Sequence, residues 1–399
     1  MMHHFEKLRI GVCLAAALVM TGCSIEPRAP GAFYQAETDL AGSPGEIIRA
    51  EPLYGAPKGA RAWRVLYRST GLSGEPIAVS GVIVAPGEAA EEPRKVVAWA
   101  HPTTGVADRC APSLGASFFG TVPQLESFLQ RGYIIAATDY PGLGTAGTHP
   151  YLVGLSEGRA VLDSVRAAIQ LPDVNAANEF AVWGHSQGGH AALFAGQLAA
   201  DYAPDLKLSG VAAAAPATDL VALFKDDISM KAGKVLTAYA IWSWNRIYDA
   251  PLSGLMDEAA ISAMDRLAKD CLEGKLQGFV VAERERGIDR DFLQTDLTEV
   301  APWKSLLTRN SPTPGLTGAP VLLAQGTADP VVQPAVTLGY ARAACRAGTP
   351  LSFILQNGAD HLGVVKQAGA SAAGWIADRL EGATPPSDCN DLPTLPASG

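Results

Sequence analysis

The sequence predicts an α/β fold in which a mostly parallel central sheet is flanked by helices. Continuous apolar runs such as "VVAWAHP" and "YIIAATDYPG" end in turn residues, which is typical of strands that are buried on both faces. Segments with helical periodicity alternate with these runs along much of the chain. Of the 399 residues, 48% are hydrophobic and 18% are charged, so the chain has enough apolar material for a sizeable core.

The first strands are expected to pair antiparallel. Residues 64–68 and 77–84 alternate between apolar and polar side chains and are separated by a glycine-rich turn, which predicts a meander. Buried strands and helices then alternate from "VVAWAHP" through "EFAVWG", "LSGVAAAAP" and "PVLLAQG" to "LSFILQNG". Such alternation predicts parallel strands joined by helices. Within it, we expect Ser156 to cap the helix "SEGRAVLDSVRAAIQ".

One long segment interrupts this alternation. Residues 218–317 have helical periodicity and contain no convincing strand, and so long an excursion between two core strands is usually functional. It predicts a helical cap inserted between late core strands. The expected organisation is a signal at 1–23, a linker at 24–45, a core at 46–217 and 318–382, the cap at 218–317 and a proline-rich tail at 383–399.

The first 23 residues have the pattern of an export signal. Lys7 and Arg9 precede an apolar run at 10–20, which is too short for a transmembrane helix of about 20 residues. A Thr-Gly pair then leads to Cys23, and this ending resembles the bacterial lipoprotein signal, in which the cysteine is lipidated. We therefore expect Cys23 to anchor the mature protein to a membrane surface of the cell envelope. The alternative is an ordinary signal peptide that is cleaved elsewhere and leaves a freely secreted protein.

Four cysteines remain once Cys23 is assigned to lipid and the earlier one is removed with the signal. An even number in an exported chain predicts two disulfides, for which three connectivities exist, and no spacing is typical of a metal site. Cys389 lies in a proline-rich tail that could hardly pack by itself. A bridge to Cys345 would attach this tail to the body and would leave Cys110 to pair with Cys271.

The charge pattern argues against a nucleic-acid partner. The net charge is −9, from 31 basic and 40 acidic residues, and both signs are scattered rather than gathered in blocks. A nucleic-acid binder normally needs a basic face. The sequence predicts no oligomeric state.

The stretch "AVWGHSQGGHAALFAG" matches a nucleophile elbow, in which a serine sits on a sharp turn between a buried strand and a helix. Gly184 and Gly188 flank Ser186 at the spacing that lets the backbone fold so sharply. Five residues with three fixed recur by chance, so the motif alone is weak. The apolar strand before it and the helix pattern after it make Ser186 a candidate nucleophile.

A serine hydroxyl needs a base, and His361 is the histidine best placed to act as one. It lies in the loop after the strand "LSFILQNG", near the carboxyl edge of the sheet. His185 occupies the variable position beside the serine, and its side chain is expected to point away. His190 lies one turn into the helix, where packing or capping is the simpler role, and no strand precedes His149.

The acid that orients the imidazole is expected to be Asp329. It follows the strand "PVLLAQG", and the order Ser186, Asp329, His361 matches one known order of such triads. Two alternatives remain. In the first, Asp329 serves only as the hydrogen-bonding residue of a β-turn. In the second, the acid is Asp360, which lies next to His361 but would reach the far ring nitrogen with difficulty.

Two backbone N–H groups are expected to form an oxyanion hole. Gln187 supplies the first because it follows the nucleophile at the start of the helix. The second comes from the loop "AHPTTG", in which Pro102 has no N–H. Thr103 or Thr104 is therefore the donor, and Thr103 is preferred. His101 either shapes the pocket or is a hydrogen-bonded structural residue.

Several motifs together resemble the secretory lipase family of α/β hydrolases. They are "YRSTGLSGEPIAVSGVIVAP", "AHPTTGVADRCAPS", "DYPGLG", "GHSQGG", "GTADPVV" and "GADH", with the long helical insert. The resemblance covers nearly all of the mature chain. It implies an α/β-hydrolase fold with a Ser-Asp-His triad at Ser186, Asp329 and His361 and a helical cap. It also implies hydrolysis of carboxylic esters, often acylglycerols.

The sequence thus predicts a serine esterase or lipase that needs no metal or cofactor and takes a small-molecule or lipid ester. Trp242, Trp244 and Tyr248 could line its acyl pocket, although such side chains more often form an insert's own core. A peptidase or amidase on the same fold is the nearest alternative. A non-catalytic envelope lipoprotein is another, and the intact serine, aspartate and histidine argue against it.

Overall fold

The computed structural model describes residues 29–36, 39–172, 174–227, 231–272, 288 and 292–395. The expected signal at 1–23, with Cys23, lies outside the described residues, and so does part of the expected cap. Within the described part of the chain, no helix combines the length and the apolar character needed to cross a membrane.

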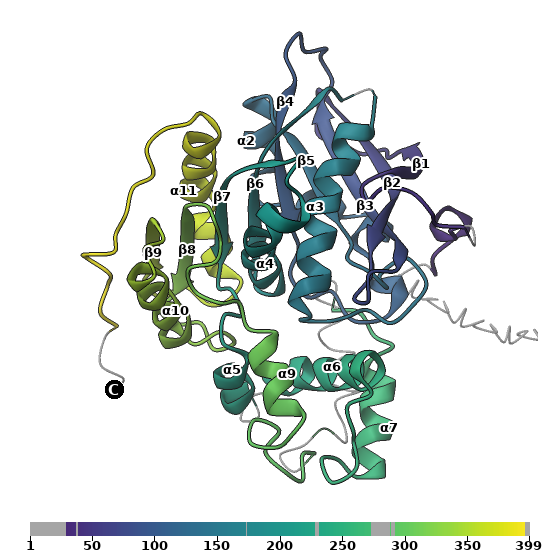
Figure 1. Ribbon diagram of the computed structural model, residues 1–399, viewed down its shortest axis with the longest axis vertical. Coiled ribbons are helices and arrows are strands. Elements are labelled where there is room, and N and C mark those ends of the chain that lie inside the picture. The colour runs from purple at the N-terminus through teal and green to yellow at the C-terminus, as the bar shows by residue number, and fades with distance from the viewer. Residues whose placement is uncertain are drawn as a thin grey trace, which may run out of the picture.

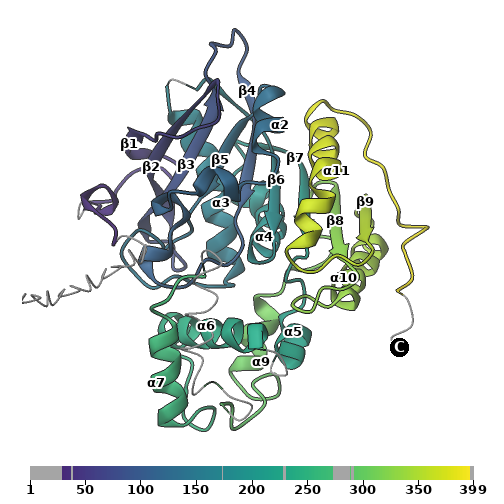
Figure 2. The ribbon, with the colours of Figure 1, turned by 180° about the vertical axis from the view of Figure 1, so that it is seen from behind.

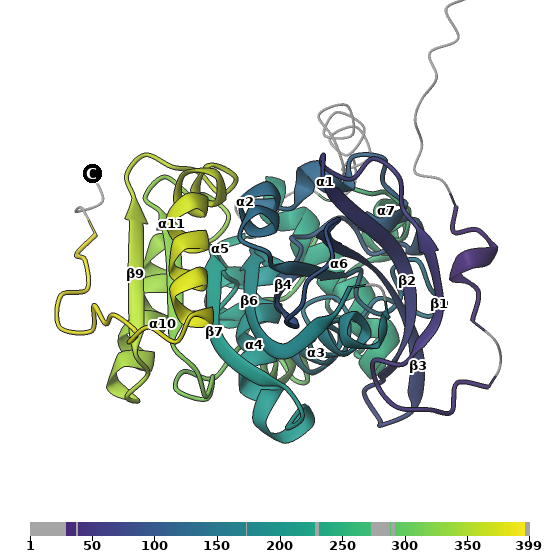
Figure 3. The ribbon, with the colours of Figure 1, turned by 90° about the horizontal axis from the view of Figure 1, so that it is seen from above.

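The described residues form one nine-stranded sheet in the order β1-β2-β3-β5-β4-β6-β7-β8-β9. In Figure 3 this sheet runs from β1 at one edge to β9 at the other. The strands are β1 (Ile47–Pro52), β2 (Ala60–Thr70), β3 (Pro76–Pro86), β4 (Arg94–Ala100), β5 (Ile134–Thr138), β6 (Ala176–His185), β7 (Lys207–Ala214), β8 (Val321–Gly326) and β9 (Leu351–Gln356).

The pairing confirms the predicted fold class. Strands β1, β2 and β3 are antiparallel, and β3 joins the rest of the sheet through an antiparallel contact with β5. All further pairs, from β5–β4 to β8–β9, are parallel. The meander expected at 64–84 is present as β2 and β3. Strand β1 was not predicted, because its half-exposed side chains show no clean alternation.

Helices cover both faces of the parallel sheet, which explains why its strands are continuously apolar. The flanking helices are α1 (Phe118–Thr121), α2 (Leu125–Gln130), α3 (Gly154–Gln170), α4 (Gln187–Tyr202), α10 (Pro334–Arg346) and α11 (Gly363–Leu380). In β4, Val97 and Trp99 belong to the core cluster that includes residues of α2 and α11, whereas Val96 and Ala98 belong to a second cluster that includes residues of α3, α4 and α10. Short 3-10 helices are η1 (Ala32–Tyr34), η2 (Asp108–Cys110) and η3 (Pro112–Leu114).

A helical insertion separates β7 from β8, as predicted. Its described helices are α5 (Leu220–Asp227), α6 (Lys231–Tyr248), α7 (Glu258–Leu267) and α9 (Trp303–Arg309). Figures 1 and 2 show these helices gathered at one end of the sheet. The aromatic side chain of Trp244 is fully buried among them and stacks on Trp303 and Phe224.

The expected cap of α3 is wrong. The helix begins at Gly154, two residues before Ser156, which therefore lies inside the first turn. A Cβ at Gly154 would come within 2.1 Å of the Phe194 ring, so α3 packs closely on α4 at this position. The N–H of Leu152, just before the helix, is instead bound by the Glu157 carboxylate at 2.9 Å.

Two disulfides join distant parts of the chain. Cys110 pairs with Cys271, and Cys345 pairs with Cys389, which is the connectivity that the position of the tail favoured. Beside the second bridge, the Asp388 carboxylate accepts the N–H of Phe353 in β9 at 2.8 Å. The tail is thus attached to the edge strand by covalent and polar contacts.

Candidate active site

Ser186 lies on a sharp turn between β6 and α4. Its backbone has φ 57° and ψ −121°, a conformation that costs free energy and is held by the surrounding structure. The two flanking glycines are required by close backbone contacts. A Cβ at Gly184 would lie 2.0 Å from the carbonyl oxygen of Gly188, and one at Gly188 would lie 1.9 Å from that of Ala100 in β4. The turn therefore has the geometry of the predicted elbow.

The structure brings the three predicted polar residues into one hydrogen-bonded row. The Ser186 hydroxyl lies 2.8 Å from Nε2 of His361, and Nδ1 of the same ring lies 2.8 Å from Oδ2 of Asp329. These residues come from three separate connections, after β6, β8 and β9. With the Nδ1 proton donated to the carboxylate, Nε2 can accept the serine proton.

Asp329 is held by its own turn. Its side chain is fully buried, and Oδ1 accepts the N–H groups of Val331 and Val332, each at 2.9 Å. Oδ2 also accepts an N–H of Gln325 at 3.2 Å. The alternative acid, Asp360, is exposed and accepts the N–H of Gly363 at the start of α11. The geometry therefore favours Asp329 over Asp360 as the partner of the imidazole.

His185 has a contact that the sequence did not indicate. Its Nε2 donates to the backbone carbonyl of His361 at 2.8 Å, and the two rings lie 4.9 Å apart. Burial, with a smaller effect of the neighbouring His361, lowers the pKa of His185 to about 3. The ring therefore stays neutral near pH 7 and supports the loop that carries His361.

A buried polar cluster lies beneath the elbow. The side-chain N–H groups of Gln187 donate to Glu157 at 2.7 Å and to Nε2 of His149 at 3.1 Å. Nδ1 of His149 faces the carbonyl of Pro141 at 2.9 Å, so this nitrogen carries the proton and Nε2 accepts. His190 lies 2.8 Å from the second oxygen of Glu157. Both histidines are thus engaged away from the serine hydroxyl.

The two expected sources of an oxyanion hole adjoin this elbow. Gln187 is the first residue of α4, where the N–H groups have no partner within the helix. In the loop after β4, the Thr103 hydroxyl lies 2.9 Å from that of Tyr151, and the Thr104 carbonyl accepts the N–H of Leu272 at 2.7 Å. His101 is buried between two backbone carbonyls, and burial lowers its pKa, which is typical of a structural role.

A small cavity of about 30 Å³ opens at Ser186 between the core and the insertion. Its wall is almost entirely apolar. The lining residues are Tyr151, Leu152, Ser186, Gln187, Ala217, Leu220, Leu223, Phe224, Leu236, Val331 and Val332. Trp242, Trp244 and Tyr248 do not line this cavity. Trp244 instead stacks on Phe224 and Trp303 of the insertion, and its two neighbours on α6 pack against the core, which is the role that the sequence favoured for such side chains.

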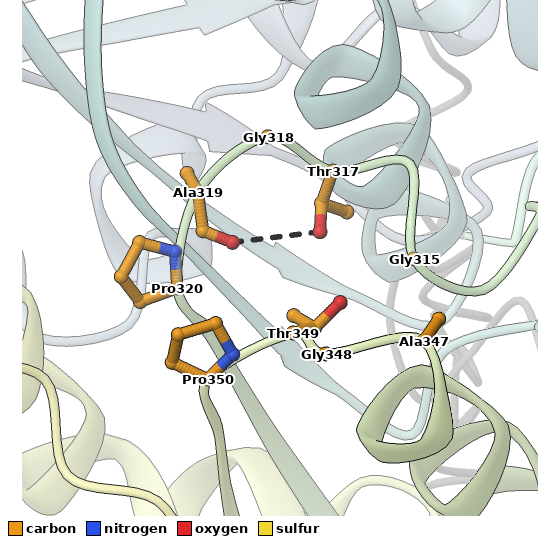
Figure 4. A pocket seen from close by; sticks show the side chains of 9 residues that line it. All are labelled: Gly315, Thr317, Gly318, Ala319, Pro320, Ala347, Gly348, Thr349 and Pro350. Atoms are coloured by element: carbon orange, nitrogen blue, oxygen red, sulfur yellow. Dashed lines mark hydrogen bonds between the residues drawn. The ribbon is translucent and has the colours of Figure 1, made fainter.

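A larger hollow of about 270 Å³ lies elsewhere, between the loops that lead into β8 and β9 (Figure 4). Asp329 and His361 follow the opposite ends of these two strands. The lining of the hollow contains two threonines, and no acid, base or cysteine. This hollow therefore lacks the side chains needed for acid–base or nucleophilic catalysis. Among the described residues, no group of three or more His, Cys, Asp or Glu side chains is arranged to hold a metal ion.

Comparison with known proteins shows which protein family this chain belongs to. The model of the secretory lipase family matches residues 121–388, about two thirds of the chain. Lipase 10 of Candida albicans is 25% identical over 96% of this chain and 88% of its own length. A probable inactive lipase of Mycobacterium tuberculosis is 24% identical over 85% of this chain and 79% of its own length.

A solved structure has the same fold. Candida antarctica lipase A in its closed state superposes with a TM-score of 0.74 at 19% identity, and the match covers 92% of this chain and 90% of that one. At this identity the likeness shows the arrangement of the sheet and helices, and it leaves the roles of single residues to the geometry.

A methyl group at Gly188 is expected to prevent the elbow from forming. In Gly188→Ala the new Cβ meets the Ala100 carbonyl, so the variant should lose about 1–3 kcal/mol of stability or more. Gly374→Ala is the matched control, because a Cβ there meets nothing within 4 Å in the middle of α11. It should gain about 0.5–1 kcal/mol. Urea denaturation measures the free energy of unfolding of both variants. Equal values for the two would contradict the close contact between Gly188 and the Ala100 carbonyl.

The buried His149 is expected to make stability depend on pH. Burial lowers its pKa to about 4, from 6.5 in the unfolded chain. The unfolded state therefore binds the proton more tightly, and stability falls as pH drops from about 6.5 towards 4. Between pH 7 and pH 5 the parent should lose about 2 kcal/mol more than His149→Gln. Urea denaturation at both pH values measures this difference. Equal losses of unfolding free energy in the parent and in His149→Gln would contradict the prediction.

Proposed function

The chain belongs to the secretory lipase family and is a carboxylic ester hydrolase of the lipase type, and we propose that it cleaves acylglycerol-type esters through an acyl-enzyme on Ser186. The observation that carries this proposal is the row of hydrogen bonds from Asp329 through His361 to Ser186, because Ser186 lines the apolar cavity.

The first half of the reaction forms the acyl-enzyme. His361 takes the hydroxyl proton as the Ser186 oxygen attacks the ester carbonyl, and the Asp329 carboxylate stabilises the imidazolium that results. The carbonyl oxygen becomes an oxyanion, held by the N–H of Gln187 and by one from Thr103 or, in its place, Thr104. Each such donor contributes about 3–4 kcal/mol in the transition state.

The second half returns the enzyme to its starting state. When the tetrahedral intermediate collapses, the bond to the alcohol oxygen breaks and His361 gives its proton to the leaving alcohol. Water then attacks the acyl-enzyme, with His361 as the base, and the carboxylic acid leaves as Ser186 regains its proton. The proposed mechanism uses no metal and no cofactor.

The walls of the cavity suit an acyl chain. No charged side chain lines it, and its apolar residues come both from α5 and α6 of the insertion and from the loop after Asp329. We therefore assign residues 218–317 the role of a cap that forms the acyl side of the site. Neither an amide substrate nor a purely binding role is favoured by a contact in this cavity. The relative described as a probable inactive lipase makes the non-catalytic alternative worth testing.

The protein is proposed to be exported and held at the cell envelope through lipid on Cys23. The signal pattern at 1–23 supports this proposal, and the family description as secretory supports export. Metabolic labelling with a clickable fatty acid tests the anchor. Label that is lost in Cys23→Ser supports it, and unlabelled parent protein in the medium contradicts it.

Ser186 is expected to react covalently with a fluorophosphonate probe. The probe should label the parent at Ser186, as located by mass spectrometry, and should leave Ser186→Ala unlabelled and without esterase activity. A series of p-nitrophenyl esters from short to long acyl chains, beside emulsified triacylglycerol, then defines the substrate. A parent that is folded but neither labelled nor active would support the non-catalytic alternative.

Asp329 and Asp360 are expected to differ sharply in their effect on kcat. In Asp329→Asn the imidazole loses the acceptor that fixes its tautomer, so kcat should fall about 10³–10⁴-fold. Asp360→Asn keeps an acceptor for the N–H of Gly363 and should retain kcat within about threefold, since Asp360 contacts the helix start and not the ring. A large loss in Asp360→Asn with little effect in Asp329→Asn would reverse the assignment.

A further inference from the structure

One fully buried carboxylate, that of Glu157 in α3, connects three parts of the site. Its Oε1 accepts the side-chain N–H of Gln187 at 2.7 Å and the backbone N–H of Leu152 at 2.9 Å. Its Oε2 lies 2.8 Å from Nδ1 of His190. A buried carboxylate is costly unless such partners surround it, so each of these contacts is strongly held.

The first contact fixes the residue that follows the nucleophile. Gln187 begins α4, and its side chain points into the protein, where the residue is 1% exposed. The bond to Glu157 therefore sets the position of the same residue whose backbone N–H faces the proposed oxyanion. An oxyanion donor acts only at about 2.7–3.1 Å, so a small shift of Gln187 weakens it.

The second contact fixes the wall of the cavity at Ser186. Leu152 lines this cavity and has a φ of 52°, in the left-handed region that a leucine seldom adopts. A loop held in such a conformation needs an external constraint. The hydrogen bond from the Leu152 N–H to Glu157 supplies this constraint.

The third contact reaches the insertion. Nε2 of His190 lies 2.7 Å from the backbone carbonyl of Asn310, directly after α9. Both ring nitrogens of His190 thus face oxygen acceptors, one on α3 and one on the insertion. The carboxylate therefore lies at the centre of a chain of contacts from the elbow helix to the end of the cap.

We propose that Glu157 is a positioning residue for ester hydrolysis, which holds Gln187 and Leu152 in place so that the oxyanion donor and the cavity wall keep their catalytic geometry. The proposal rests on the proposed function of Ser186. It differs from a purely structural role because it predicts a loss in the chemical step and not only in stability.

The chain offers a matched control on the same helix. Asp163 is also a fully buried carboxylate of α3, and it accepts hydrogen bonds from Ser69, Arg166 and Tyr202. None of these partners contacts the elbow or the cavity. Glu157→Met and Asp163→Leu each replace a buried carboxylate by an apolar side chain of similar size and remove its acceptor oxygens, one inside and one outside the proposed positioning network.

The test measures kcat and KM of both full-length variants, after folding is verified, with an ester and with its thionoester analogue. Sulfur accepts hydrogen bonds poorly, so the ratio of the two rates reports on the oxyanion donors. Glu157→Met removes the acceptor for Gln187 and Leu152, so it should lower kcat for the ester about 10- to 100-fold, keep KM within about twofold and narrow the ester-to-thionoester ratio of kcat. Asp163→Leu should keep both kcat and this ratio.

Either of two results would overturn the proposal: parental kcat and ratio in Glu157→Met, or equal losses in Asp163→Leu. Should Glu157→Met fail to fold, Gln187→Met gives the same test, because it removes the side-chain amide and keeps the backbone N–H. It should lower kcat and narrow the ratio, and an unchanged kcat would refute the positioning role. A parent that neither hydrolyses esters nor reacts at Ser186 would instead refute the proposed function.

Discussion

The close approach of two backbones at the elbow is the constraint on which the rest of the site depends. Gly188 lies so near the Ala100 carbonyl that no side chain fits between α4 and the end of β4. This contact places Ser186 above the carboxyl edge of the sheet. In parallel strands all carboxyl ends meet at that edge, so the connections after β8 and β9 bring Asp329 and His361 to the same serine. Three distant segments converge because the sheet is parallel.

This geometry explains how much of the site could be predicted from sequence. The order of Ser186, Asp329 and His361, each after a buried strand, was enough to bring them together once the strands were taken as parallel. The fold class followed from the same apolar runs. Local details were less accessible: α3 begins at Gly154, where it packs closely on α4, whereas the sequence pattern alone placed the start at Ser156. Such contacts depend on tertiary packing that a single segment does not encode.

The buried partners of the elbow were missed for a different reason. Glu157 and Val161 lie four residues apart on the same buried face of α3, so an acid interrupts an otherwise apolar stripe. A charge at such a position must be paired inside the protein, and His190 is paired with it on α4. The acid within this apolar stripe could have predicted a buried polar site, but the sequence could not have predicted which residues contact it. His185 gave no comparable signal, because its acceptor is a backbone carbonyl 176 residues away in sequence.

The insertion is joined to both sides of the proposed oxyanion hole, by different chemistry on each side. The loop after β4 is linked to it by the bond between Cys110 and Cys271, next to a backbone contact from Thr104 to Leu272. The elbow helix is linked to it by the hydrogen bond from His190 to the end of α9. Two points of the insertion, Cys271 near its middle and Asn310 near its end, are therefore bound to the parts of the core that must not move during catalysis. Helix α5 carries neither link and supplies Leu220, Leu223 and Phe224 to the cavity wall, so changes in α5 can alter this wall while the donors keep their geometry.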